Sequence, residues 1–156
     1  MEQHKVDAVL ANLVSIETGL AQIYQYLANR EHFSRPVRMF WNNMQKEEQK
    51  HAQLIQELRN LQHSRPDAVE VTGIDRESVQ AFIDKIKTVL IEVKKPGLSE
   101  SAAYSIGAVI EAELDEGAFI DKIKVADEQY KAIIRSVAND CKKHSAMLAA
   151  YAHGAR

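Results

Sequence analysis

The stretch that decides the fold is Glu47-Glu48-Gln49-Lys50-His51-Ala52, in the middle of residues 34–62, where apolar side chains recur at regular intervals. Glu48 and His51 are three residues apart, so on a helix they project from the same face. The rest of that face is apolar, as in the core of a helical bundle: Phe40, Trp41, Met44, Ile55 and Leu58. A buried charge without a partner is very costly, so the sequence predicts a strong partner for this pair.

The composition favours one helical domain that spans residues 1–156. The chain is 46% hydrophobic and 27% charged, with six glycines and three prolines. Its formal net charge is −2 with both signs interspersed, so we expect no nucleic acid as partner. No signal peptide or apolar run of about 18 residues is evident, so we expect no membrane span and a cytoplasmic location. Cys141 is the single cysteine and cannot form an internal disulfide.

Spacings of three and four residues predict four long helices in two hairpins, residues 3–29 with 34–62 and residues 99–123 with 127–151. Residues 65–98 are predicted to be a crossover that carries an extra helix from Arg76 to about Val93. The first turn is short, so its two helices must be antiparallel neighbours. Glu17 and Glu48 are both about fifteen residues from that turn and should therefore lie at the same level.

The two predicted hairpins repeat each other. A shift of 96 residues, from 17 to 113, places Glu17 on Glu113 and aligns the apolar stripes of the first and third helices. A shift of 93 residues, from 51 to 144, places His51 on His144 and aligns the second helix with the fourth. The sequence therefore predicts that polar residues from all four helices meet inside the bundle.

The register of the third helix depends on which glutamate faces inward. If Glu111 were the counterpart of Glu17, the same helical face would turn Asp115 and Lys122 inward. The pattern therefore favours Glu113. The fourth helix contains one mismatch: Cys141 stands where the repeat would place the glutamate of a second Glu-x-x-His pair.

Ferritin-like di-iron carboxylate proteins have one glutamate on each of two helices and a Glu-x-x-His pair on each of the other two. The chain resembles the rubrerythrin-like branch of that superfamily, without the rubredoxin-type domain. The resemblance is carried by Glu17 followed by Tyr24, by residues 47–52, by Glu113-Leu114-Asp115-Glu116, and by His144. It implies an all-α fold, a ferritin-like antiparallel four-helix bundle.

By this resemblance, the site would hold two metal ions, most simply iron, with manganese or zinc as alternatives. The implied ligands are Glu17, Glu48, His51, Glu113, Glu116 and His144, with the hydroxyl of Tyr24 hydrogen-bonded near them. The carboxylate missing from the fourth helix could be replaced by the thiolate of Cys141 or, after local distortion, by Asp140. The sequence favours the other reading of Cys141, in which it is only a small buried apolar group.

The resemblance implies an oxidoreductase that reduces peroxide or dioxygen as iron is oxidised. Because the chain lacks the two Cys-x-x-Cys knuckles of typical rubrerythrins, a separate protein would donate the electrons. A homo-oligomer, with a dimer favoured, is expected. The alternatives are iron storage in a larger shell and a degenerate bundle that binds one metal or none and serves as a structural or binding module. A histidine phosphotransfer bundle ranks low, because His51 and His144 lie on the inward stripes.

Overall fold

The computed structural model describes residues 3–154, apart from the side chains of residues 115–117. This part of the chain is predominantly helical, as predicted. Its α-helices are α1 (Gln3–Ala28), α2 (Arg35–Ser64), α3 (Arg76–Glu92), α4 (Glu100–Gly117) and α5 (Glu128–Ala152). Two short strands, β1 (Val69–Val71) and β2 (Ile123–Val125), each follow a turn of 3-10 helix, Pro66–Ala68 and Ile120–Lys122.

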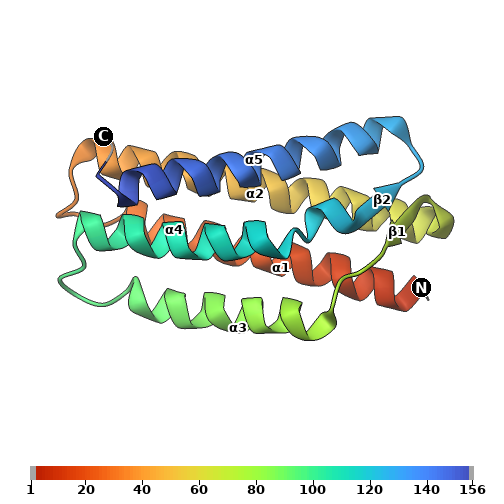
Figure 1. Cartoon of the computed structure of the whole chain (residues 1–156), viewed down its shortest axis with the longest axis horizontal. Coiled ribbons are helices and arrows are strands. Elements are labelled where there is room, and N and C mark those ends of the chain that lie inside the picture. The colour runs from red at the N-terminus through yellow and green to blue at the C-terminus, as the bar shows by residue number, and fades with distance from the viewer. Residues whose placement is uncertain (1–2, 155–156) are drawn as a thin grey trace.

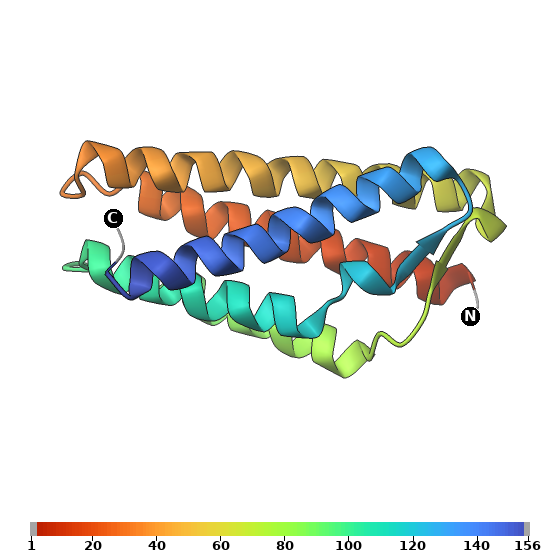
Figure 2. The same cartoon turned by 45° about the horizontal axis from the view of Figure 1, so that its top comes forward.

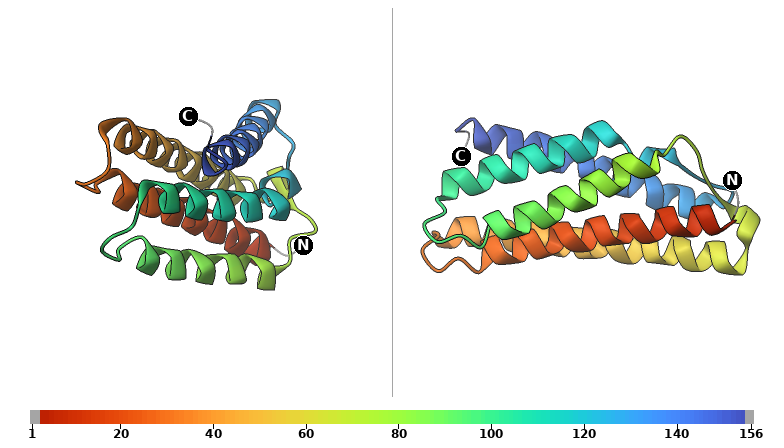
Figure 3. Two further views of the ribbon diagram at one scale, coloured as in Figure 1. Left: turned by 60° about the vertical axis from the view of Figure 1, so that its left-hand side comes forward. Right: turned by 90° about the horizontal axis from the view of Figure 1, so that it is seen from below.

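The long helices α1, α2, α4 and α5 form a bundle of two hairpins, α1 with α2 and α4 with α5 (Figure 1). Helix α3 lies outside these four and packs mainly against α1, on the side of the bundle formed by α1 and α4 (Figure 3). The paired strands lie at the end of the bundle where the chain begins, and the chain ends at the opposite end (Figure 2). Residues 65–98 thus carry the chain along the bundle, as the crossover prediction required.

The helix starts follow from local chemistry. Pro36 stands in the first turn of α2, where a missing N–H costs nothing. The side chain of Asp75 accepts hydrogen bonds from the backbone N–H groups of Glu77 and Ser78 at the start of α3. Asp127 does the same for the N–H of Gln129 at the start of α5. These caps satisfy donors that the first helical turn leaves unpaired.

Helix α4 ends earlier than the sequence predicted. Ala118 adopts the left-handed conformation, with φ 45°, and its N–H donates to the carbonyl of Leu114 at 3.2 Å. Such a residue is a common helix terminator. The predicted extension of this helix to residue 123 is therefore wrong, and Ile123 belongs to a strand instead.

Strands β1 and β2 pair antiparallel and join the crossover to the connection between α4 and α5. Val69 lies opposite Val125 and Val71 opposite Ile123, all four buried. The outward pair, Glu70 and Lys124, carries opposite charges. Three-residue strands are too short to show a period of two, which is why the sequence did not reveal them.

Helix α1 is long and apolar enough, by length and composition alone, to be a weak candidate for a membrane span, although it contains no unbroken run of about 18 apolar residues. However, 50% of its most apolar window is buried inside the protein. Its inward face packs on α2 and α3 and carries the buried Glu17. This is the pattern of a core helix in a bundle.

Gly107 allows α4 to approach α2 and α5 closely. A Cβ atom at this position would lie 2.7 Å from Cη2 of Trp41 and 3.3 Å from the methyl groups of Leu148, and both side chains are fully buried. We expect Gly107→Ala to lower the free energy of unfolding by about 1–2 kcal/mol, because overpacking outweighs the gain in helix propensity. Urea denaturation measures this effect. Ser105→Ala, at an exposed position of the same helix, is the control, and equal or higher stability of Gly107→Ala would contradict the close packing.

Candidate metal centre

Each of the four bundle helices places a polar side chain in the interior. These side chains are Glu17 on α1, Glu48 and His51 on α2, Glu111 on α4 and His144 on α5, each no more than 1% exposed. Their neighbours along the helices are buried apolar residues, so each helix carries its polar group within an apolar stripe. The bundle therefore holds three carboxyl groups and two imidazoles away from water.

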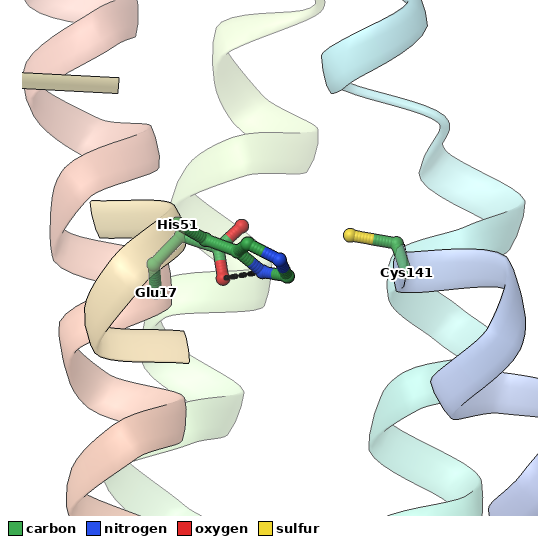
Figure 4. A group of neighbouring side chains, drawn as sticks. All are labelled: Glu17, His51 and Cys141. Carbon is green, nitrogen blue, oxygen red and sulfur yellow. Dashed lines mark ion pairs between the residues drawn. The ribbon is translucent and has the colours of Figure 1, made fainter. Parts of the chain in front are cut away.

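These residues and one thiol fall into two groups. In each group, one possible ligand atom per residue lies within 4.8 Å of the others. We call them the cysteine group, which is Glu17, His51 and Cys141, and the glutamate group, which is Glu48, Glu111 and His144. Figure 4 shows the cysteine group, whose three side chains point toward one another from α1, α2 and α5.

Glu48 connects the two groups. Its Oε2 lies 3.1 Å from Nδ1 of His51, and its Oε1 lies 2.8 Å from Nδ1 of His144. The two imidazole rings stack with centroids 5.8 Å apart and an angle of 29° between their planes. One carboxylate thus presents one oxygen to each histidine, which is the arrangement that a carboxylate between two cations requires.

Several atoms of the cluster have no hydrogen-bond partner among the described residues: Glu17 Oε2, Glu48 Oε1, Glu111 Oε2 and His144 Nδ1. Glu48 Oε1 and His144 Nδ1 are close, but their contact is one of charge and not an aligned hydrogen bond. Buried polar atoms without partners cost free energy. Bound cations would give these oxygen and nitrogen atoms partners, and oxygen with imidazole nitrogen suits iron, manganese or zinc.

The protonation of the cluster is shifted strongly from that of free side chains. Burial and the neighbouring Glu48 carboxylate raise the pKa of Glu17, and the same two causes raise the pKa of Glu111 to about 8. Burial opposes ionisation of Glu48 too, but contacts with His144 and His51 hold its pKa well below the usual range. Although burial disfavours charged imidazoles, the carboxylates raise the pKa of His51 to about 11 and that of His144 to about 9. Protons therefore occupy the cluster at neutral pH, and cations would displace them.

The outer nitrogen of each histidine is held by a carboxylate from the opposite hairpin. Nε2 of His51 lies 3.1 Å from Oδ2 of Asp140 on α5, and Nε2 of His144 pairs with Oε2 of Glu47 on α2. Each acid stands four residues before the histidine of its own helix, so the two pairs cross between α2 and α5. Such partners fix the ring and leave Nδ1 directed at the cluster.

Substitution of Glu47 or Asp140, whose side chains are 43% and 34% exposed, tests the role of these crossed pairs. We expect Glu47→Gln and Asp140→Asn each to weaken the binding of Zn²⁺ by about 10–100-fold, because the imidazole loses the partner that orients it. Isothermal titration measures the affinity, and Asp84→Asn, at an exposed position of α3, is the control. Wild-type affinity in both variants would show that the pairs do not position the rings.

Glu113 does not lie in the cluster, and Glu111 takes the place predicted for it. The side chain of Glu113 is 42% exposed and forms an ion pair with Lys85 of α3. The argument against Glu111 assumed that one helix continues to Lys122, but α4 ends at Gly117. The signal that identifies Glu111 is the spacing of the buried residues of α4: Ala103, Gly107, Ile110, Glu111 and Leu114.

The remaining predicted residues differ in their placement. Tyr24 is fully buried and its hydroxyl donates to Oε1 of Glu111, while its ring stacks on Trp41. Cys141 belongs to the cluster, and burial together with nearby carboxylates raises the pKa of its thiol. Asp140 contacts the outer side of His51 and does not replace a ligand. The side chain of Glu116 lies outside the described residues.

Comparison with known proteins does not assign this arrangement. No family model matches the chain, and neither a curated protein nor a solved structure matches it significantly. The chemistry of the site therefore has to be inferred from its own residues.

Proposed function

We propose that the protein is a dinuclear metal protein of the ferritin-like, rubrerythrin-like kind, which uses iron to reduce peroxide or dioxygen. The observation that carries this proposal is the position of Glu48, with one oxygen 3.1 Å from a nitrogen of His51 and the other 2.8 Å from a nitrogen of His144. A carboxylate between two such groups offsets the repulsion between two cations. The arrangement of α1, α2, α4 and α5 in two hairpins supports a ferritin-like bundle.

The charges of the cluster also support the proposal. Among the described residues, the ion-pair partners of Glu17 and Glu48 are His51 and His144, and not lysine or arginine. Once these imidazoles lose their protons to act as ligands, the three carboxylates Glu17, Glu48 and Glu111 would be left without counter-charge. Two divalent cations supply that charge.

The residues of the chain would divide the work as follows. Bound iron would supply one electron per ion to the oxidant, and a separate donor protein would restore both electrons. Glu17 and His51 would hold one ion, Glu111 and His144 would hold the other, and Glu48 could offer one oxygen to each. The hydroxyl of Tyr24 orients the Glu111 carboxyl group, and the apolar stripes around the site exclude water.

Anaerobic titration with Fe²⁺ tests this proposal. We expect two ions per chain, and ferric absorption that develops when hydrogen peroxide or dioxygen is added. Glu111→Gln and Glu113→Gln form a matched pair, because the two glutamates stand on the same helix but one is buried in the cluster and the other pairs with Lys85. We expect Glu111→Gln to lose one ion and Glu113→Gln to retain both. A wild-type protein that binds no Fe²⁺ would overturn the proposal.

A further inference from the structure

The cysteine group brings a sulfur atom to the metal centre. Cys141 is 7% exposed, and Figure 4 shows its thiol directed across the interior toward the imidazole of His51 and the carboxyl group of Glu17. One ligand atom from each of the three lies within 4.8 Å of the others. The three residues come from three different helices, so packing of the bundle, and not local sequence, creates the group.

A second observation points to a ligand at this place. Oε2 of Glu17 is buried and has no hydrogen-bond partner among the described residues. Nδ1 of His51 lies 3.8 Å from it, which is beyond hydrogen-bond distance. An unpaired carboxyl oxygen in a dry interior is costly. A cation bound between Glu17, His51 and Cys141 would remove that cost.

The two groups differ in the chemistry of their donors. The glutamate group offers oxygen and nitrogen, whereas the cysteine group adds sulfur in the place where the repeat would put a second carboxylate. Thiolate is a soft ligand that favours zinc and similar cations, while carboxylate favours harder ions such as Mn²⁺ and Mg²⁺.

We propose that the cysteine group is a thiolate-ligated position for a thiophilic divalent cation, Fe²⁺ in the proposed function and Zn²⁺ as its redox-inert probe, next to a harder position at the glutamate group. The inference rests on the proposed function, because it takes the neighbouring position to be a cation site as well. Binding breaks the S–H bond of Cys141 as the bond from sulfur to the metal forms, and the proton leaves to solvent. No electron is transferred. Asp140 does not compete for this role, since it is held at the outer nitrogen of His51.

Spectroscopy on the wild-type protein tests the sulfur contact directly. We expect X-ray absorption of the Zn²⁺-loaded protein to show one sulfur neighbour at about 2.3 Å. We also expect Co²⁺ to give a near-ultraviolet charge-transfer band from sulfur. A first shell of oxygen and nitrogen alone, without such a band, would overturn the inference but leave the proposed function standing if two ions are bound.

Two variants separate the inference from the proposed function. Cys141→Ser and Cys141→Glu should both lose the sulfur band, and Cys141→Glu should still bind two ions. Its preference for Zn²⁺ over Mn²⁺ should fall by a factor on the order of ten or more, because a carboxylate replaces the soft ligand. An unchanged preference would overturn the inference. One cation per wild-type chain with a sulfur neighbour would keep the thiolate position and overturn the two-cation function.

Discussion

Replacement of Glu48 by glutamine is expected to abolish the binding of both cations, the largest effect of any single change in the cluster. Glutamine has the same shape but carries no charge, and its amide nitrogen is not a ligand. One of the two histidine-facing oxygens of Glu48 would therefore be lost whichever way the amide turned. Loss of a residue that only supports a ligand lowers metal affinity by about 10–100-fold. Loss of this shared ligand should therefore lower the affinity of both metal positions by more than about 100-fold.

Metal analysis after desalting and titration with Zn²⁺ measure this loss. Glu57→Gln is the matched control, because Glu57 lies on the same helix at an exposed position and should bind like wild type. Circular dichroism of both variants establishes that the helices remain. If Glu48→Gln still bound two ions, Glu48 would not lie between the two metal positions.

The metal-free protein is expected to lose stability as the pH rises from about 6.5 to 9, the second large effect. Carboxylate contacts, acting against burial, raise the pKa of His144 from 6.5 to about 9 and that of His51 to about 11. A group with a raised pKa binds its proton more tightly in the folded chain. Its contribution to stability is thus complete below its unfolded pKa and is lost as the pH rises through the folded value. Glu111 acts in the same direction, because its pKa rises from 4.5 to about 8.

The free energy of unfolding is expected to fall by a few kcal/mol in order of magnitude, since one pKa unit corresponds to about 1.4 kcal/mol. For a chain of this size, each kcal/mol lowers the melting temperature by roughly 2–4 °C. Thermal unfolding between pH 6.5 and 9, with a chelator present, measures it. Saturating Zn²⁺ should remove the decline, because the cation binds the deprotonated ligands. Glu111→Gln should reduce the decline of the melting temperature with pH in the metal-free protein. A melting temperature that rises with pH would contradict the claim that the folded cluster binds its protons more tightly than the unfolded chain does.

The sequence was sufficient to predict the helical fold and four of the five polar residues that meet inside it. Glu17, Glu48, His51 and His144 were found because each interrupts an apolar stripe at a level set by its distance from a turn. The convergence of these residues depends on regular helices, which the 3.6-residue period describes well. The prediction from that period failed on α4, where Glu113, predicted to face inward, has a side chain that is 42% exposed.

The fifth residue was missed because the period was applied beyond the end of its helix. The exclusion of Glu111 used Lys122, which lies after the left-handed Ala118 and belongs to a different element. The crossed pairs of Glu47 and Asp140 could not be predicted either. They depend on the distance and angle between α2 and α5, which contribute side chains from chain positions about ninety residues apart, and no local pattern contains that information.

The crossed pairs would also let protons pass through the wall of the bundle. Each imidazole has one nitrogen inside the cluster and the other against a carboxylate that reaches water. An imidazole can take up a proton at one nitrogen and release one at the other. Protons that leave when cations enter would therefore cross the seam between α2 and α5 while every helix stays in place. Exchange of protons with solvent on this side of the bundle, which faces away from α3, would keep the net charge of the buried cluster constant.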